Sequence, residues 1–126
     1  MRVRRLSRTV TRIFDDALRP HGMSTAQLNM LVAITRAGPL RPSELGRALD
    51  LEKSTVSRNL ERMLSHRWIR TTPEPEGNGY RLEVQPGGRA LLERALPSWA
   101  KAQEQARSLA GETLASAVLG MESGGA

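Results

Sequence analysis

The sequence predicts a mainly α-helical domain with one small β-hairpin. Apolar residues recur at helical spacing through most of the chain, and only after His66 does the pattern alternate as in a strand. With 126 residues, 39% of them hydrophobic, the chain is long enough to bury one modest core. We therefore expect a single domain over residues 1–126.

Residues 1–20 form the first predicted helix, which should end near Arg19 and Pro20. Its apolar residues, from Val3 to Leu18, make one narrow stripe. Such a stripe needs a cover, and the pattern leaves open whether a helix of a second subunit or the chain's own domain provides it. Five arginines off the stripe could neutralise DNA or a membrane headgroup, or simply solvate the helix; they are Arg2, Arg4, Arg5, Arg8 and Arg12.

Three shorter helices are expected between residues 24 and 64. Ser24 and Gln27 have the spacing of a capping box, and the helix that they begin should stop at Gly38. Pro42 suits the first position of a short helix that runs to about residue 49. A tight turn through residues 50–52 then leads into a third helix, whose buried face comprises Val56, Leu60, Met63 and Leu64.

A hairpin and a long helix complete the predicted fold. Residues 68–72 and 80–84 form the two arms, and the turn-forming segment 73–79 should protrude between them, with its prolines preventing ladder pairing there. From residue 86 a long helix runs, which Pro97 should bend and Gly111 should end. A short last helix is expected over about residues 112–119, and residues 121–126 are not expected to order.

The charge of the chain is unevenly distributed and indicates an anionic partner. The formal net charge is +6, from 19 Lys and Arg against 13 Asp and Glu. Residues 1–35 and 36–70 each carry +4, whereas residues 71–126 carry −2. Because excess cations attract polyanions, nucleic acid and anionic lipid are the candidate partners.

Composition also excludes several classes of protein. Without cysteine there is no disulfide or thiolate site, and the two histidines cannot form a zinc site alone. We find no nucleophile and base set, no paired carboxylates and no phosphate-binding glycine loop, so we expect no catalytic residues, no metal and no cofactor. No apolar run approaches the roughly 18 residues that cross a bilayer, and no signal peptide is recognisable, which predicts a cytoplasmic protein without a membrane partner.

Two helices joined by a tight turn and followed by a protruding hairpin make a winged helix-turn-helix. The outward side of its third helix carries hydroxyl, amide and cationic side chains, which suit phosphates and base edges of double-stranded DNA. An ordinary solvated helix surface is the alternative interpretation. The residues on this side are Lys53, Ser54, Thr55, Ser57 and Arg58, with Asn59 and Arg62 near its edge.

The sequence also resembles the multiple-antibiotic-resistance regulator (MarR) family of bacterial transcription factors. The resemblance covers residues 6–110, and its most specific segments are "SELGRALDLEKSTVSRNLERML" and "GGRALLERALPSWAKAQ". It implies a homodimer in which residues 1–20 and 86–120 form the dimer helices and residues 21–85 the DNA-binding lobe, with a wing at about 73–79. It further implies a palindromic operator, usually repression, and release from DNA by small, often aromatic or phenolic, effectors bound between the dimer helices and the lobe.

The resemblance also assigns roles to individual residues. Ser43 would contact phosphate, the outward residues of the third helix would enter the major groove, and Arg70 would brace the wing. The wing tip departs from the family, which often has arginines there, because the aligned residues are Glu76, Gly77 and Asn78. The predicted DNA contacts are therefore Ser43, Lys53, Ser54, Thr55, Ser57, Arg58, Arg62, Arg70 and, as substitutes for tip arginines, Asn78 and Arg81.

The acidic wing and the aromatic residues also fit other interpretations. Glu74 and Glu76 would be repelled by phosphates, so the chain could instead be a winged-helix protein-interaction module with little DNA affinity. Trp99 and Tyr80 could line an effector pocket, or they could pack at the Pro97 bend and the wing base. His21 and His66 are expected to lie in loops or at helix ends.

Overall fold

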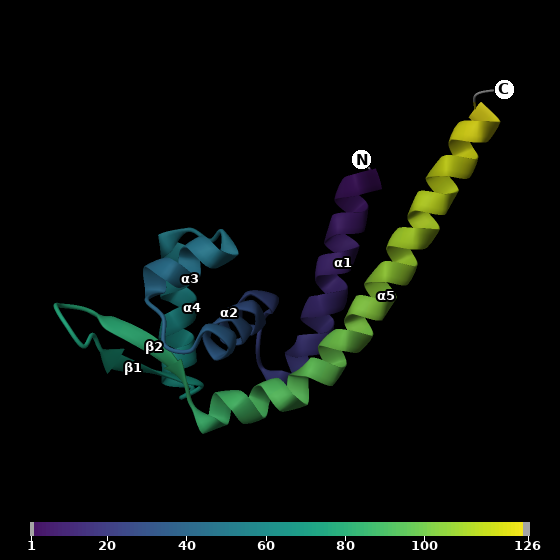
Figure 1. Cartoon of the computed structure of the whole chain (residues 1–126). Coiled ribbons are helices and arrows are strands. Elements are labelled where there is room, and N and C mark those ends of the chain that lie inside the picture. The colour runs from purple at the N-terminus through teal and green to yellow at the C-terminus, as the bar shows by residue number, and fades with distance from the viewer. Residues whose placement is uncertain (1, 125–126) are drawn as a thin grey trace.

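The computed structural model describes the backbone of residues 2–124 and the side chains of residues 5–115. It is mainly helical with a two-stranded antiparallel wing, as predicted, and α1 and α5 run side by side away from the lobe (Figure 1). The elements are α1 (Arg2–Leu18), a 3-10 helix η1 (Arg19–His21), α2 (Thr25–Ala37), α3 (Pro42–Leu49), α4 (Lys53–Ser65), β1 (Ile69–Pro73), β2 (Tyr80–Val84) and α5 (Pro86–Gly124).

The starts of the lobe helices follow from their local sequence. The backbone N–H of Gln27 donates to Ser24 Oγ at 3.2 Å, and the backbone N–H of Ser24 donates to Gln27 Oε1 at 3.0 Å, which confirms the capping box of α2. At the start of α3, the N–H of Arg41 donates to Glu44 Oε1 at 3.0 Å. α2 ends as expected at Gly38, whose φ of 74° a glycine adopts without a Cβ penalty.

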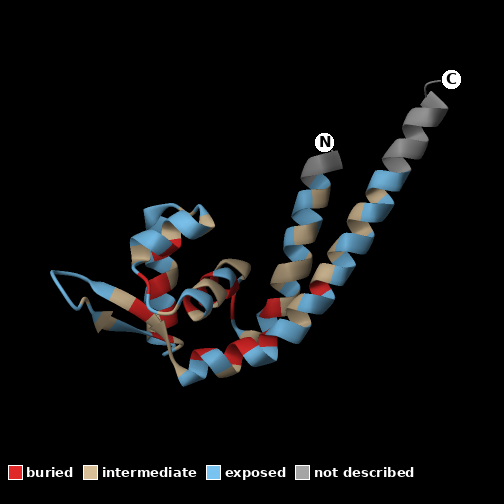
Figure 2. Cartoon of the chain, viewed as in Figure 1, coloured by how far each residue is buried: buried red, intermediate tan, exposed pale blue. Residues whose placement is uncertain are grey.

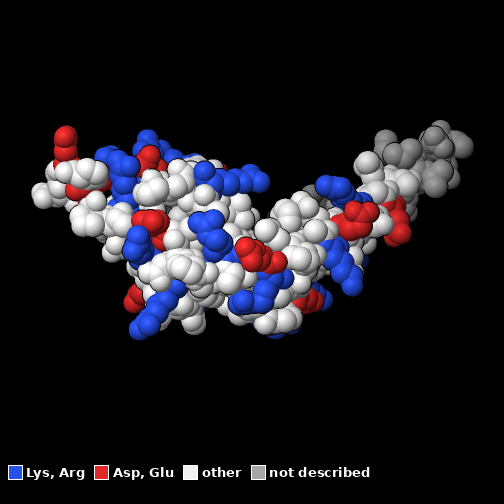
Figure 3. Space-filling view, turned by 60° about the horizontal axis from the view of Figure 1, so that its bottom comes forward, with Lys and Arg blue, Asp and Glu red and all other residues white. Residues whose placement is uncertain are grey.

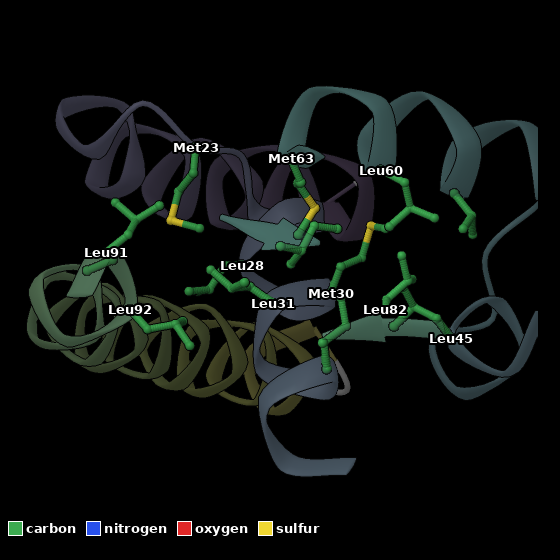
Figure 4. Close-up of a cluster of buried hydrophobic side chains, with 14 of the residues drawn as sticks. Met23, Leu28, Met30, Leu31, Leu45, Leu60, Met63, Leu82, Leu91 and Leu92 are labelled. Atoms are coloured by element: carbon green, nitrogen blue, oxygen red, sulfur yellow. The ribbon is translucent and has the colours of Figure 1, made fainter. Parts of the chain in front are cut away.

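One apolar core joins the lobe to the first turns of α5 (Figure 4). The predicted inward face of α4 is confirmed, since Val56, Leu60 and Met63 are buried and Leu64 is half-buried. Each such side chain contributes roughly 1.5–3 kcal/mol through burial, so this face fixes which side of α4 remains in solvent. The largest fully buried side chains are Leu18, Leu28, Met30, Leu31, Ile34, Leu45, Met63, Ile69 and Leu82.

The second strand of the wing matches the predicted arm of residues 80–84, whereas the first is shifted by one residue. β1 starts at Ile69 and continues to Pro73, which pairs with Tyr80, so the expectation that no proline would pair is wrong at this position. A single bridge places Leu40 beside Leu82 on the other side of β2, with N···O distances of 2.7 and 3.2 Å. β1 is therefore the outer strand, where a proline without an N–H is tolerated.

Helix α5 is continuous where a break was predicted. It contains Pro97, and it changes direction in that part of its length (Figure 1), which agrees with the predicted bend. Gly111 does not end it, and there is no separate helix over residues 112–119, because a glycine in a helix costs only about 1 kcal/mol and its helix-forming neighbours outweigh that. The helix includes residues 121–124, contrary to the expectation for this tail, and residues 125–126 lie outside the described residues.

The apolar stripe of α1 is only partly covered by its own chain. Leu18 is fully buried, whereas Leu6, Val10, Ile13 and Phe14 are half-buried against α5, and Val3 lies outside the described side chains. On α5, Leu96 is 42% and Leu114 is 67% exposed. Figure 2 shows few buried residues on α1 and α5 in the parts of these helices that lie away from the lobe. Within the described residues, no helix combines the length and apolar character that spanning a bilayer requires.

Candidate nucleic-acid interface

The turn between α3 and α4 brings the two helices into close contact. Asp50 adopts a left-handed conformation with φ of 52°, and the N–H of Leu51 donates to the carbonyl oxygen of Gly46 at 2.9 Å. A Cβ placed on Gly46 would lie 3.4 Å from Val56 Cγ2, so a side chain at this position would press on α4. The tight turn thus holds α4 against α3 with its other side free.

The free side of α4 carries most of the predicted groove-reading residues. Lys53, Ser54, Ser57 and Arg58 are exposed, and among residues 5–115 they make no side-chain hydrogen bond or ion pair. Thr55 is half-buried, and its carbonyl oxygen accepts a hydrogen bond from Asn59 Nδ2 at 2.9 Å. The helix therefore presents two cations and two hydroxyls in an orientation that a duplex can approach.

A hollow of about 650 Å³ lies beside this face and connects it to the wing. Ser43 of α3 and Lys53 and Ser57 of α4 line it, so three of the predicted contact residues come together here. Gly79 and Tyr80 of the wing also line it, which places the half-exposed Tyr80 at this hollow instead of in a packed wing base. Arg47 also lines it and was missed from the sequence, where nothing distinguishes it from other surface arginines.

An ion cluster formed by Glu74, Arg41 and Arg81 lies at the wing base, by which we mean the place where the loop of residues 74–79 leaves the two strands. Arg41 Nε lies 2.6 Å from Glu74 Oε1, and Arg81 Nε lies 3.1 Å from both carboxylate oxygens of Glu74. The Glu74 side chain is only 5% exposed. Its hydrogen bonds from Arg41 and then Arg81 lower the pKa of the Glu74 carboxyl from its ordinary value of 4.5, and Glu74 in turn raises the pKa of Arg41.

This cluster changes the interpretation of the acidic wing. Glu74 is not an isolated negative charge, because two guanidinium groups surround its carboxylate, and Figure 3 shows both signs of charge at the wing end of the molecule. Nearer the lobe, Arg70 Nη2 lies 3.3 Å from Glu83 Oε1 on the opposite strand, consistent with a bracing role. Asn78 is exposed in the loop between the strands.

Arg62 lies apart from the other predicted contacts. It is exposed, but it lines a second hollow of about 640 Å³ with Asp15, Met23, Gln27 and His66. This hollow lies where the end of α1, η1 and the start of α2 meet the end of α4. A DNA contact by Arg62 stays a prediction, and its position equally suits a role in this second hollow.

The remaining aromatic and histidine residues have structural partners. Trp99 packs on Phe14 with ring centroids 5.8 Å apart, which explains it through packing beside the α5 bend. His66 follows the last residue of α4 and stacks on Trp68 with centroids 4.9 Å apart. His21 ends η1, and its Nε2 lies 3.0 Å from Ser98 Oγ. Both histidines are helix-end residues, as predicted.

A helix pair with a tight turn, an outward-facing second helix and a protruding hairpin define a winged helix-turn-helix protein. Comparison with known proteins narrows this class to one family, since the sequence model of the MarR family matches residues 21–77. Residues 21–77 thus match the MarR family of winged helix-turn-helix transcriptional regulators, and the fold of the described chain agrees with that match. This is a family of regulators and not of enzymes, as the sequence predicts.

Individual relatives agree with this assignment. The multiple antibiotic resistance protein MarR of Salmonella typhimurium is 30% identical over 84 residues, which are 66% of this chain and 58% of that relative. The M. tuberculosis transcriptional regulator MosR, solved in complex with DNA, is 28% identical, with a TM-score of 0.71 over 93% of this chain and 94% of that one. Bordetella bronchiseptica BpsR, solved in a study of its regulation by 6-hydroxynicotinic acid, has the same fold at 22% identity, with a TM-score of 0.74 over 82% of this chain and 80% of that one.

Proposed function

We propose that this protein binds double-stranded DNA through the outward side of α4 and regulates transcription, most simply as a repressor. The observation that carries the proposal is the orientation of α4. Its apolar face is fixed in the core by Val56, Leu60 and Met63, which leaves the hydroxyl-bearing and cationic face unpaired in solvent. Short hydroxyl side chains allow close approach to a groove, and Arg58 suits bidentate hydrogen bonding to guanine. The related MosR, solved with DNA, supports the same role.

We further propose that the DNA-binding form is a homodimer. The half-buried stripe of α1 and the exposed Leu96 and Leu114 of α5 form apolar surface that α1 and α5 of a second copy would cover. A two-fold axis between the copies requires a palindromic operator, with half-sites about one helical turn, roughly 10 bp, apart. A repressor of this kind acts by occupying its operator in the cytoplasm.

The second hollow is our candidate effector site. It lies between the α1 and η1 segment and the lobe. Arg62, the ring of His66 and Met23 line it together with Asp15 and with Arg19, whose guanidinium is paired with Asp16 at 2.8 Å. This mixture suits a small aromatic or phenolic acid, and the regulation of BpsR by 6-hydroxynicotinic acid supports that class. An effector bound here would change the angle between the dimer helices and the lobe, and hence the spacing of the two α4 helices.

Selection of genomic DNA fragments by the purified protein tests the proposal. We expect enrichment of fragments that share an inverted repeat, with half-sites one helical turn apart, and binding that weakens steeply with salt. Fragments with a single half-site would support DNA binding but contradict the dimer. If no sequence is enriched among the recovered fragments, and if the affinity for DNA does not respond to salt, the result would favour the protein-interaction module that the arginine-free wing tip allows.

A further inference from the structure

Apart from the outward side of α4, the structure has a second concentration of cationic side chains, which is formed by the two arginines at the wing base. The bridge between Leu40 and Leu82 is antiparallel, so the next residue on one strand, Arg41, lies beside Arg81 on the other. Both side chains reach Glu74, which shows that they lie on the same face of the sheet. Two like charges side by side on one face of a sheet are unfavourable unless an opposite charge lies next to both.

The carboxylate of Glu74 accepts a hydrogen bond from the Nε atom of each arginine. Arg41 and Arg81 each donate from Nε, and among residues 5–115 no protein group accepts from their terminal Nη atoms. A guanidinium has five N–H donors, so four remain on each arginine. The Arg41 side chain is 53% exposed and that of Arg81 is 38% exposed, whereas Glu74 is almost fully covered. The cluster therefore presents cationic donors to solvent and keeps its carboxylate behind them.

The cluster also borders the surface proposed to face DNA. Arg41 directly precedes Pro42 and Ser43, and Arg81 directly follows Gly79 and Tyr80. These four neighbours line the hollow that Lys53 and Ser57 of α4 also line. The N-terminal turn of α3 begins at the same place, with Pro42 at its first position and Glu44 in its first turn.

We propose that Arg41 and Arg81 form a phosphate-binding site at the wing base, with Glu74 as the positioning residue that fixes their geometry. The ligand is one phosphate of the duplex backbone, so the inference rests on the proposed DNA-binding function. The site supplies from the base of the wing the cationic contact that the tip, with Glu76, Gly77 and Asn78, lacks. Arg41, Arg81 and Glu74 together carry one net positive charge, and the Glu44 carboxylate, which accepts from the Arg41 backbone N–H at 3.0 Å, lies at the α3 side of the cluster. The phosphate would therefore bind on the side of the Nη atoms that are unpaired among residues 5–115.

The first test removes the donors. Affinity is measured against salt concentration for the duplex recovered by fragment selection and for a duplex of unrelated sequence. We expect Arg41→Ala and Arg81→Ala each to weaken binding about tenfold on both duplexes, because a phosphate contact is independent of sequence. Because both arginines of a protomer bind one phosphate, the double variant should reduce the log–log salt slope by about 0.9 per protomer, or about 1.8 for the dimer on its operator, and no more. Unchanged affinity and slope would overturn the proposal.

The second test separates positioning from charge. If Glu74 only reduced the positive charge, Glu74→Gln would strengthen binding, as would Glu76→Gln, which removes the same charge from the exposed wing loop. If Glu74 positions the arginines, Glu74→Gln weakens binding while Glu76→Gln does not. Equal effects of the two variants would contradict the positioning role. Arg81→Lys provides a check that leaves Glu74 intact, since it keeps the charge but loses the guanidinium, and we expect it to bind as weakly as Arg81→Ala.

Failure of this inference is distinguishable from failure of the proposed function. If the unmodified protein binds no duplex in a salt-dependent way, the function itself is wrong. If it binds, and Arg58→Ala weakens binding while the variants at Arg41, Glu74 and Arg81 do not, only the phosphate site is wrong. Thermal unfolding of each variant confirms that the comparison concerns folded protein.

Discussion

Gly88, in the first turn of α5, lies directly against the backbone of Trp68. A Cβ placed on this glycine would be 2.2 Å from the Trp68 carbonyl oxygen and 2.9 Å from its carbonyl carbon. The same oxygen accepts a hydrogen bond from the N–H of Gln85 at 2.9 Å, so it cannot move away freely. The contact joins the start of the hairpin to the start of α5.

Gly88→Ala should therefore destabilise the protein by about 1–3 kcal/mol, the usual cost of overpacking, as measured by urea unfolding. Gly111→Ala is the matched control on the same helix, because nothing lies within 4 Å of its Cβ position. It should stabilise the protein by about 0.5–1 kcal/mol. Equal and small effects at both positions would show that α5 does not pack on Trp68 in this way.

The backbone conformation of Arg67 also predicts how a substitution changes stability. It connects α4 to β1 with φ of 60°, a left-handed conformation that costs residues with a Cβ roughly 1–2 kcal/mol. Arg67→Gly should raise the free energy of unfolding by about 0.5–1 kcal/mol, since the added freedom of glycine in the unfolded chain offsets part of the gain. Arg67→Ala keeps the Cβ and should give no such gain. Stabilisation by alanine equal to that by glycine would indicate that the arginine side chain, not φ, is responsible.

Glu74 predicts a specific dependence of stability on pH. Its carboxyl has a lowered pKa in the folded state because Arg41 and Arg81 donate to the ionised form. The carboxylate therefore stabilises the fold at pH above its ordinary pKa of 4.5, and this contribution is lost as the pH falls through the lower folded-state pKa. The stability difference between the unmodified protein and Glu74→Gln should thus be largest near neutral pH and shrink below 4.5. A difference that stays constant down to strongly acidic pH would contradict the cluster.

The exposed Leu114 of α5 tests the proposed dimer. Leu114→Lys should shift the protein from dimer to monomer in sedimentation experiments, because it places a charge in a surface that a second copy would bury. Thr71→Lys adds the same charge to the exposed wing strand and should leave the assembly unchanged. A monomeric unmodified protein at micromolar concentration would remove the dimer from the proposal.

The lobe was predictable because its signals are local. Ser24 with Gln27, Pro42, and the spacing of Val56, Leu60 and Met63 each act within one or two helical turns, and each was confirmed. The end of α5 was mispredicted because Gly111 is a weak signal that its helix-forming neighbours outweigh. The extension of β1 to Pro73 depends on β1 being the outer strand, which only the tertiary arrangement decides.

In the candidate site, too, the residues fixed by local sequence were predicted and those fixed by the tertiary arrangement were not. Ser43, Lys53 and Ser57 were named from the sequence and meet at one hollow, because the short turn between α3 and α4 constrains them. Arg41 was missed, since its partner Glu74 is 33 residues away and the two meet only through the bridge of Leu40 to Leu82. Net charge alone counted Glu74 as a repulsive group, whereas the structure surrounds it with arginines.

The central claim is that the outward side of α4 reads base pairs, and base preference at Arg58 tests it most directly. Affinities of the unmodified protein and Arg58→Ala are compared over duplexes that vary each base pair of the selected site, with Arg36→Ala as a control cation on α2. We predict that Arg58→Ala costs on the order of 1–3 kcal/mol and loses discrimination at one base pair per half-site. Uniform weakening at every position, or no more weakening than Arg36→Ala produces, would contradict the claim.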